Sequence, residues 1–148
     1  MTGLAVGLAV AAGLAGAIQA AVMGELGGRA GIFPALAFSG IVAVVISFAL
    51  LLVADQSFRG LADVVRNPLW LWTGGALSVL IILAITVASP RIGITATVGI
   101  IIAFNLGVAT VIDRFGLFGY DRIPIGWTRL LGIVLFGVGA ALSLHKGG

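Results

Sequence analysis

Two side-chain amides and one carboxylate have the residue types and positions suited to handling a solute inside a membrane. Gln19 and Asn105 each lie within a long apolar segment, and Glu25 lies near the end of the first segment. Polar groups are costly in hydrocarbon, so each amide is expected to hydrogen-bond either a substrate or another helix. Glu25 precedes Arg29 at the i,i+4 spacing that favours an ion pair on one helix. If Glu25 instead lies in a cavity, burial disfavours its charged form and makes it the candidate proton carrier.

Hydroxyl and indole groups supply the other substrate-binding candidates, which are Ser39, Thr97, Trp70 and Trp72. Most hydroxyls in the apolar segments are expected to bond back to their own helices. The residues concerned are Ser39, Ser47, Ser78, Thr86, Thr95, Thr97 and Thr110. Thr95 and Thr97, near the start of the fourth segment, are the expected exceptions. Trp70 and Trp72 either anchor a helix at the membrane interface or contact the substrate.

The titratable residues exclude the usual kinds of active site. The chain has no cysteine, and its single histidine, His145, lies near the end. The five acids, all at or beyond the ends of the apolar segments, are Glu25, Asp55, Asp63, Asp113 and Asp121. These residues compose no nucleophile–base pair, metal cluster or carboxylate dyad, so we predict neither an enzyme nor a metal or cofactor site. The glycine-rich stretch from Gly24 to Gly31 lacks the Lys-Ser/Thr of a phosphate-binding loop and is expected to form a tight interfacial turn.

The composition places these candidates in a lipid bilayer. Of 148 residues, 61% are hydrophobic and only 9% are charged, and the mean hydropathy is +1.26; a soluble domain averages about 25% charged residues. The basic residues are spread singly, so nucleic-acid binding is not indicated. We predict a single all-α transmembrane domain with five spans, at about residues 4–24, 33–54, 68–89, 92–112 and 128–145. Pro34, Pro68 and Pro90 lie at or beside the predicted helix starts.

Small residues in the spans predict close helix packing. The first span carries them in two neighbouring rows, Ala5, Ala9, Gly13, Ala17 and Ala21, and Ala12, Gly16, Ala20 and Gly24. Such faces let helix backbones approach closely in lipid. Gly74, Gly75, Gly132, Gly137 and Gly139 are expected to act in the same way.

The odd number of spans leaves the two termini on opposite sides of the membrane, and the excess of basic residues on one side is small. Either the N-terminus is cytoplasmic or the chain inserts in both orientations. Two opposed copies would form the inverted repeat that is common in transporters. Asp113 and Arg114 are expected to form an interfacial ion pair. Arg91, at the start of the predicted fourth helix, either sets the topology or binds an anionic substrate beside the helix N-terminus.

The sequence resembles the YdcZ-type branch of the drug/metabolite transporter superfamily over nearly its whole length. The resemblance rests on the Gly16–Gln19 to Leu26-Gly27 stretch, the Pro34 and Ser39 region, PLWLWTGGALS (Pro68–Ser78), SPRIGITATVGI (Ser89–Ile100), IDRFGLFG (Ile112–Gly119) and the Arg129–Gly132 start of the fifth span. It implies a five-helix, multi-pass protein of the bacterial inner membrane. It also implies a secondary transporter that pairs in antiparallel fashion, as a dual-topology homodimer or with an oppositely oriented paralogue. Phe104-Asn105 stands where the family often has Gly-Gln, and Met23 where Asn is common.

These observations predict a secondary transporter that moves a small organic solute or drug-like metabolite by alternating access in an antiparallel homodimer of five-helix bundles. Its cavity would lie between two copies near the midplane, lined by Gln19 and Asn105 with Trp70 or Trp72 nearby. With no acid in the middle of a span, the substrate is expected to be neutral, zwitterionic or weakly polar. Two other functions stay open: a channel or passive facilitator for small uncharged solutes, and a non-transporting membrane subunit that needs a partner.

Overall fold

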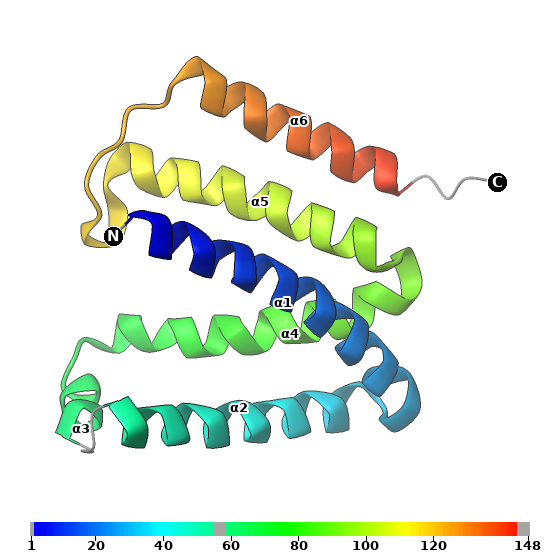
Figure 1. The fold of residues 1–148 in the computed structure, drawn as a ribbon, viewed down its shortest axis with the longest axis vertical. Helices are drawn as coiled ribbons and strands as arrows, with labels where there is room; N and C mark the ends of the chain where they lie inside the picture. Colours follow the sequence, from blue (N-terminus) through cyan, green and yellow to red (C-terminus); the bar gives the residue numbers. More distant parts are fainter. Residues whose placement is uncertain (1, 55–58, 145–148) are drawn as a thin grey trace. The chain divides into compact units, whose positions relative to one another are not determined.

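The regular structure of the described residues is entirely helical, which confirms the prediction of an all-α protein. The structure, a computed structural model, describes residues 2–54 and 59–144. Its helices are α1 (Thr2–Ala30), α2 (Ile32–Ala54), α3 (Arg59–Val65), α4 (Thr73–Ile92), α5 (Ile94–Phe115) and α6 (Trp127–Ser143), with short 3-10 segments η1 (Leu69–Trp72) and η2 (Leu117–Gly119) (Figure 1). Asp55, His145 and Lys146 lie outside the described residues.

Four stretches are long and apolar enough to cross a membrane. They are Gly3–Ala30, Ile32–Ala54, Leu69–Ile92 and Ile94–Phe115. These correspond to the first four predicted spans. The fifth predicted span corresponds to α6, which is apolar but shorter, with 17 residues. The chain is therefore built as a multi-pass membrane protein.

Glycines rather than prolines break the helices. The helix α1 continues through the glycine-rich stretch and is followed directly by Gly31, which has a φ of 93°. The prediction that this whole stretch forms a turn is therefore wrong, because only Gly31 has the positive φ that glycine adopts readily. Gly93, with a φ of 87°, similarly separates α4 from α5. Pro90 and Arg91 consequently lie in the last turn of α4 and not at the start of a helix. Arg91 is thus placed where its charge suits a helix C-terminus, three residues before the start of α5, and both roles predicted for it stay predictions.

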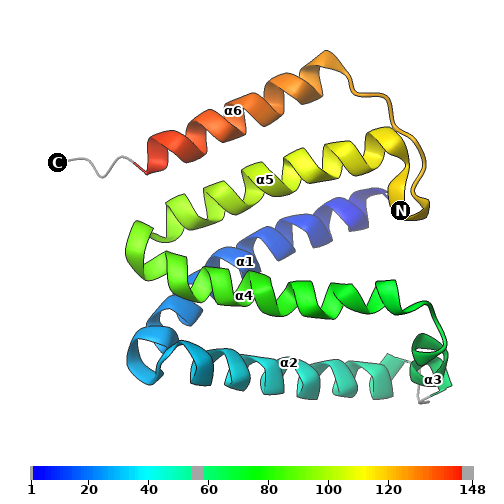
Figure 2. The ribbon, with the colours of Figure 1, turned by 180° about the vertical axis from the view of Figure 1, so that it is seen from behind.

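The chain packs as two compact units. The first comprises the residues up to Ala21 together with those from Ala88 onward, and the second is Val22–Val87. In the first unit, α5 and α6 lie side by side and run antiparallel, joined by η2 and an extended segment (Figures 1 and 2). The second unit contains the last turns of α1, the helices α2 and α3, η1 and most of α4.

Close helix packing occurs at glycines other than those predicted. A Cβ atom added to Gly27 would lie 2.5 Å from Cγ2 of Thr86 on α4, and one added to Gly99 would lie 3.5 Å from Cα and Cβ of Ala140 on α6. The glycines predicted to pack in this way, Gly74, Gly75, Gly132, Gly137 and Gly139, have no atom within 4 Å of such a Cβ among the described residues. The prediction for these five is wrong within one chain, because no atom of the described residues approaches them closely, and Gly75, Gly137 and Gly139 line cavities instead.

The two rows of small residues on α1 differ in burial. The row Ala5, Ala9, Gly13, Ala17 and Ala21 is exposed throughout. In the neighbouring row, Ala20 and Gly24 are buried and Gly16 is half-buried. One face of α1 therefore packs within the chain, and the face beside it is left uncovered.

Candidate functional site

The two amides lie on the chain's surface near the middle of long helices. Gln19 is exposed on α1 and Asn105 is exposed on α5, and both belong to the first unit. Within the described part of the chain, neither amide has a side-chain hydrogen bond. Both are therefore available to bond a group from outside the chain, and their predicted roles in substrate binding stay predictions.

Two apolar cavities flank the contact between α5 and α6. The first, of about 420 Å³, is lined by Thr95, Gly99, Leu135, Phe136, Gly139, Ala140 and Ser143. The second, of about 450 Å³, includes Phe104, Ile133 and Gly137. Neither has a charged residue in its lining. The glycines of α6 that contact nothing else thus leave hollows beside α5, and these hollows suit an uncharged, largely apolar group.

Most intramembrane hydroxyls are satisfied by their own helices, as the sequence predicts. The donors Ser47, Ser78, Thr86 and Thr110 bond the carbonyl oxygens of Ala43, Gly74, Ile82 and Leu106 at 2.7–2.9 Å. Thr97, expected to be an exception, also donates to the Gly93 carbonyl at 2.8 Å, so that expectation is wrong. The reason is local: Thr97 lies one turn after the helix start, within reach of the Gly93 oxygen. Thr95 has no such bond within the described residues and lines the first cavity.

Ser89 is a polar residue that the sequence interpretation missed. Its side chain is 5% exposed, and its hydroxyl has no hydrogen-bond partner in the part of the chain that the structure describes. An unpaired buried hydroxyl costs about 1–3 kcal/mol. The sequence analysis used Ser89 only as the end of a span and as part of the SPRIGITATVGI stretch, because the lack of a partner for its hydroxyl depends on the packing around it. Ser89 therefore joins the candidates for solute contact.

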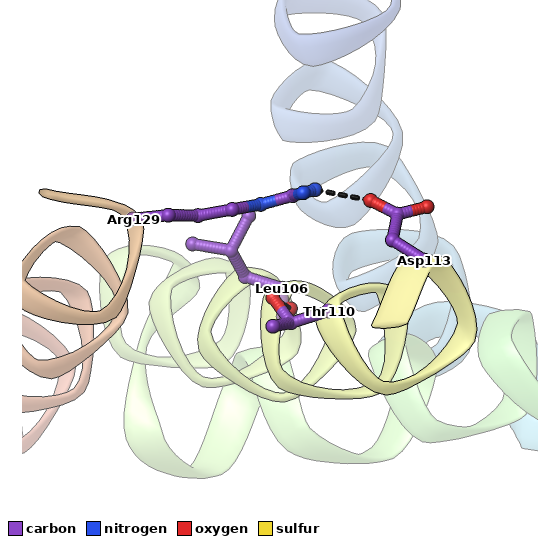
Figure 3. Close-up of polar contacts among 4 residues, drawn as sticks. All are labelled: Leu106, Thr110, Asp113 and Arg129. Carbon is purple, nitrogen blue, oxygen red and sulfur yellow. Dashed lines mark hydrogen bonds and ion pairs between the residues drawn. The ribbon is translucent and has the colours of Figure 1, made fainter. Parts of the chain in front are cut away.

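An ion pair joins α5 and α6 at the end where the chain passes from one helix to the other. Figure 3 shows the guanidinium of Arg129 reaching from the start of α6 to the carboxylate of Asp113, next to the buried Thr110. The side chains are 34% and 20% exposed, respectively. The predicted pair of Asp113 with Arg114 is wrong, because neighbouring residues on a helix point in different directions. Arg129, distant in sequence, is the residue that faces Asp113.

The other described acids of the helices are also paired. Glu25 accepts a hydrogen bond from Nε of Arg29 at 2.6 Å, which confirms the predicted i,i+4 pair. Both side chains are exposed, and the proposed role of Glu25 in proton coupling stays a prediction. Asp63 lies 3.7 Å from Arg66. Among the described residues, no carboxylate within a helix is left unpaired, and no group of three or more His, Asp or Glu side chains could hold a metal ion.

The remaining candidates belong to the second unit. Trp70 and Trp72 lie on η1, each about half exposed. Trp72 lines an open cavity of about 580 Å³ together with Asn67, Leu71 and Gly75. Ser39 on α2 is half-buried. Indole rings at the end of a membrane helix suit the headgroup region, so anchoring and substrate contact both remain compatible with these positions.

These features define a class of protein: a helical, multi-pass membrane chain with solute-sized hollows and isolated amides in its spans. The chain matches the DMT_YdcZ family model, described as "Putative inner membrane exporter, YdcZ", over residues 4–142. It therefore belongs to this family and is a multi-pass inner-membrane protein of a transporter class rather than an enzyme class. No curated protein and no solved structure gives a significant match to the chain.

Proposed function

We propose that this protein exports a small neutral, zwitterionic or weakly polar organic solute by alternating access, as an antiparallel homodimer of five-span protomers. The family supports export across the inner membrane. The observation that carries the rest is that Gln19 and Asn105 are exposed and have no side-chain hydrogen bond to any described residue. An amide facing lipid with no hydrogen bond costs several kcal/mol. A second copy or a bound solute must therefore cover each of them.

The fifth span of the proposal is α6. Its 17 residues give a length of about 25 Å at 1.5 Å per residue. This is at the short end of the range of about 17–25 residues for membrane helices. Because α6 packs beside α5, which is long enough to span, its apolar side chains lie next to a helix of membrane-spanning length. Five spans place the two termini on opposite sides.

A second copy in the opposite orientation gives the arrangement that such a chain needs. The uncovered row of small residues on α1 permits close approach of another helix. A two-fold axis in the membrane plane would bring each exposed amide to a matching surface of the partner, since such an interface uses the same patch on both copies. In the helices that the structure describes, each carboxylate is paired with an arginine, which supports a solute without strong positive charge.

The export proposal is tested with amide variants. Cells expressing the wild type are compared with cells expressing Gln19→Leu or Asn105→Leu, and small molecules in the medium are profiled. We expect at least one neutral or zwitterionic solute to accumulate outside only with the wild type. Ser47→Ala is the matched control, because Ser47 is exposed on α2 but bonds its own helix. Identical profiles for the wild type and the Leu variants would refute the proposal.

Dimer retention separates the two roles of the amides. A variant that loses export but still migrates as a dimer in mild detergent has lost a solute contact. A variant that becomes monomeric has lost a contact between copies. Export that continues after the ion gradients are collapsed would instead support a passive facilitator.

The antiparallel arrangement is tested by labelling. Because the chain has no cysteine, a single cysteine added at the C-terminus reports orientation without a background. Intact cells are treated with a membrane-impermeant maleimide before and after permeabilisation. We expect roughly half of the protein to be labelled from outside, as two opposed orientations require. Labelling of nearly all or none would exclude the dual-topology homodimer and direct the search to an oppositely oriented partner.

A further inference from the structure

The connection between α5 and α6 folds back on the end of α5. The helix stops at Gly116, whose φ of 64° is left-handed and whose N–H bonds the Ile112 carbonyl. After η2, the chain returns so that the Ile123 N–H donates to the Asp113 carbonyl at 2.8 Å. This bond ties the returning segment to the last turn of α5. It brings Arg122 to the same end of the hairpin as Arg114.

Gly116 makes room for Arg122. A Cβ atom at position 116 would lie 2.8 Å from Cγ of Arg122 and 2.9 Å from the Tyr120 carbonyl oxygen. The aliphatic part of Arg122 thus lies directly over the glycine backbone. This contact limits the directions that the guanidinium group can take.

The two arginines line one cavity. It has a volume of about 360 Å³ and is formed by Arg114, Phe115, Arg122, Ile123 and Pro124. Two of the lining residues are arginines, one is aromatic and two are aliphatic. A cavity of this kind matches a ligand that has a compact negative charge next to hydrocarbon.

No carboxylate of the described chain neutralises these two arginines. Asp113, beside Arg114 in sequence, is held by Arg129 (Figure 3). Asp121, beside Arg122, is exposed and does not line the cavity. Neither Arg114 nor Arg122 has an ion-pair partner among the residues that the structure describes. Two like charges on residues that line one cavity repel each other, and an anion bound between them would remove that repulsion.

The cavity lies at the end of a membrane-spanning helix, where headgroups are found. Phe115, Phe118, Tyr120 and Trp127 surround it in sequence and are 62–79% exposed. Aromatic rings and arginines together are typical of the membrane interface. Basic pockets at this depth bind the phosphates of anionic lipids.

We propose that Arg114 and Arg122 together bind a phosphate group at the membrane interface, with the apolar remainder of the ligand against Phe115, Ile123 and Pro124. Arginine suits this role because its planar fork donates two parallel hydrogen bonds to phosphate oxygens. The phosphate can belong to an anionic phospholipid or to a soluble phosphate ester. The site is separate from Gln19 and Asn105 and does not depend on the proposed transport function.

The test measures lipid binding to the purified full-length protein in a neutral detergent. Phosphatidylglycerol and phosphatidylcholine are added in turn, and bound lipid is quantified by native mass spectrometry. We expect a preference for phosphatidylglycerol that falls about tenfold or more in the double variant Arg114→Gln/Arg122→Gln, as the loss of charge-assisted hydrogen bonds implies. The double Lys variant keeps the charge but loses the paired geometry, so intermediate binding is expected.

The matched control is Arg91→Gln. Arg91 is an exposed arginine at the end of α4 that has no ion-pair partner among the described residues and does not line this cavity. Its replacement should leave phosphatidylglycerol binding unchanged. Equal binding by the wild type and the double Gln variant, or an equal loss in Arg91→Gln, would overturn the proposal. An unchanged thermal transition in the double variant shows that it is folded.

A competition experiment identifies the source of the phosphate. Glycerol 3-phosphate is added in excess to the complex with phosphatidylglycerol. Displacement that needs Arg114 and Arg122 supports a site for a soluble phosphate ester. No displacement, with lipid binding that still depends on the two arginines, supports a lipid headgroup site.

Discussion

Replacement of Gly27 by alanine tests the closest approach that an added Cβ atom would make at the described glycines. The added methyl carbon would lie 2.5 Å from Cγ2 of Thr86, whereas carbon atoms in contact prefer about 3.5–4.0 Å. At least about 1 Å must therefore be gained by movement of a helix or of the Thr86 side chain. Rotation of Thr86 is restrained, because its hydroxyl donates to the Ile82 carbonyl at 2.7 Å.

The expected loss of stability depends on whether a helix moves or the Thr86 side chain rotates. Overpacking of a well-packed contact costs about 1–3 kcal/mol. Rotation of Thr86 would instead give up a hydrogen bond worth about 1 kcal/mol. Alanine also favours a helix over glycine by about 1 kcal/mol. Gly28→Ala carries the same helix preference but meets no atom within 4 Å, so the difference between the two variants isolates the contact. We expect Gly27→Ala to be less stable than Gly28→Ala by about 1–3 kcal/mol.

The assay is unfolding in mixed detergent micelles, followed by tryptophan fluorescence. The decisive variant is Gly27→Ala/Thr86→Ser, because serine keeps the hydroxyl and removes only the methyl group that clashes. The double variant should recover most of the loss, which gives a coupling energy in a double-mutant cycle. Equal stability of Gly27→Ala and Gly28→Ala, or no recovery in the double variant, would refute the contact between α1 and α4.

Two ion pairs give further predictions. Arg129→Gln leaves the carboxylate of Asp113, which is 20% exposed, without its partner, so the free energy of unfolding should fall by about 1.5–3 kcal/mol. Most of this loss should be recovered in the double variant Asp113→Asn/Arg129→Gln. If the losses of the two single variants simply add in a denaturation series, the pairing is contradicted. Glu25→Gln removes an ion pair whose side chains are 79% and 67% exposed, so the stability should fall by less than about 1 kcal/mol in the same assay. Transport by Glu25→Gln should be followed across pH with Arg29→Gln as control, and a pH dependence that survives in Glu25→Gln would remove Glu25 as the proton carrier.

Features set by neighbouring residues could be predicted from the sequence. The ion pair of Glu25 with Arg29 and the bond from Ser47 to its own helix both follow from helical spacing. Proline positions were less informative. Pro90 lies inside the last turn of α4, because the break depends on the positive φ of Gly93 and not on the missing N–H of the proline. Helix ends were therefore less predictable than the helices themselves.

The contacts of glycines could not be predicted from their number or spacing. Gly27 and Gly99 approach other helices, whereas Gly74 and Gly137 meet no atom within 4 Å. Whether a small residue packs depends on which direction its face points, and this is set by the path of the whole chain. Asn105 illustrates the same limit, since the sequence places it inside a span but leaves its surroundings open.

The sequence by itself determined that this protein lies in a membrane, that it is helical and which family it resembles. Its long apolar segments require a bilayer, and a backbone in hydrocarbon must satisfy its own hydrogen bonds, which makes helices obligatory. Only the tertiary structure decided which distant residues meet. The left-handed turn at Gly116 returns the chain along α5, so that Arg129 pairs with Asp113 while Arg122 joins Arg114 in one cavity. These partners are separated along the chain, and their meeting depends on backbone geometry that no local pattern of residues encodes.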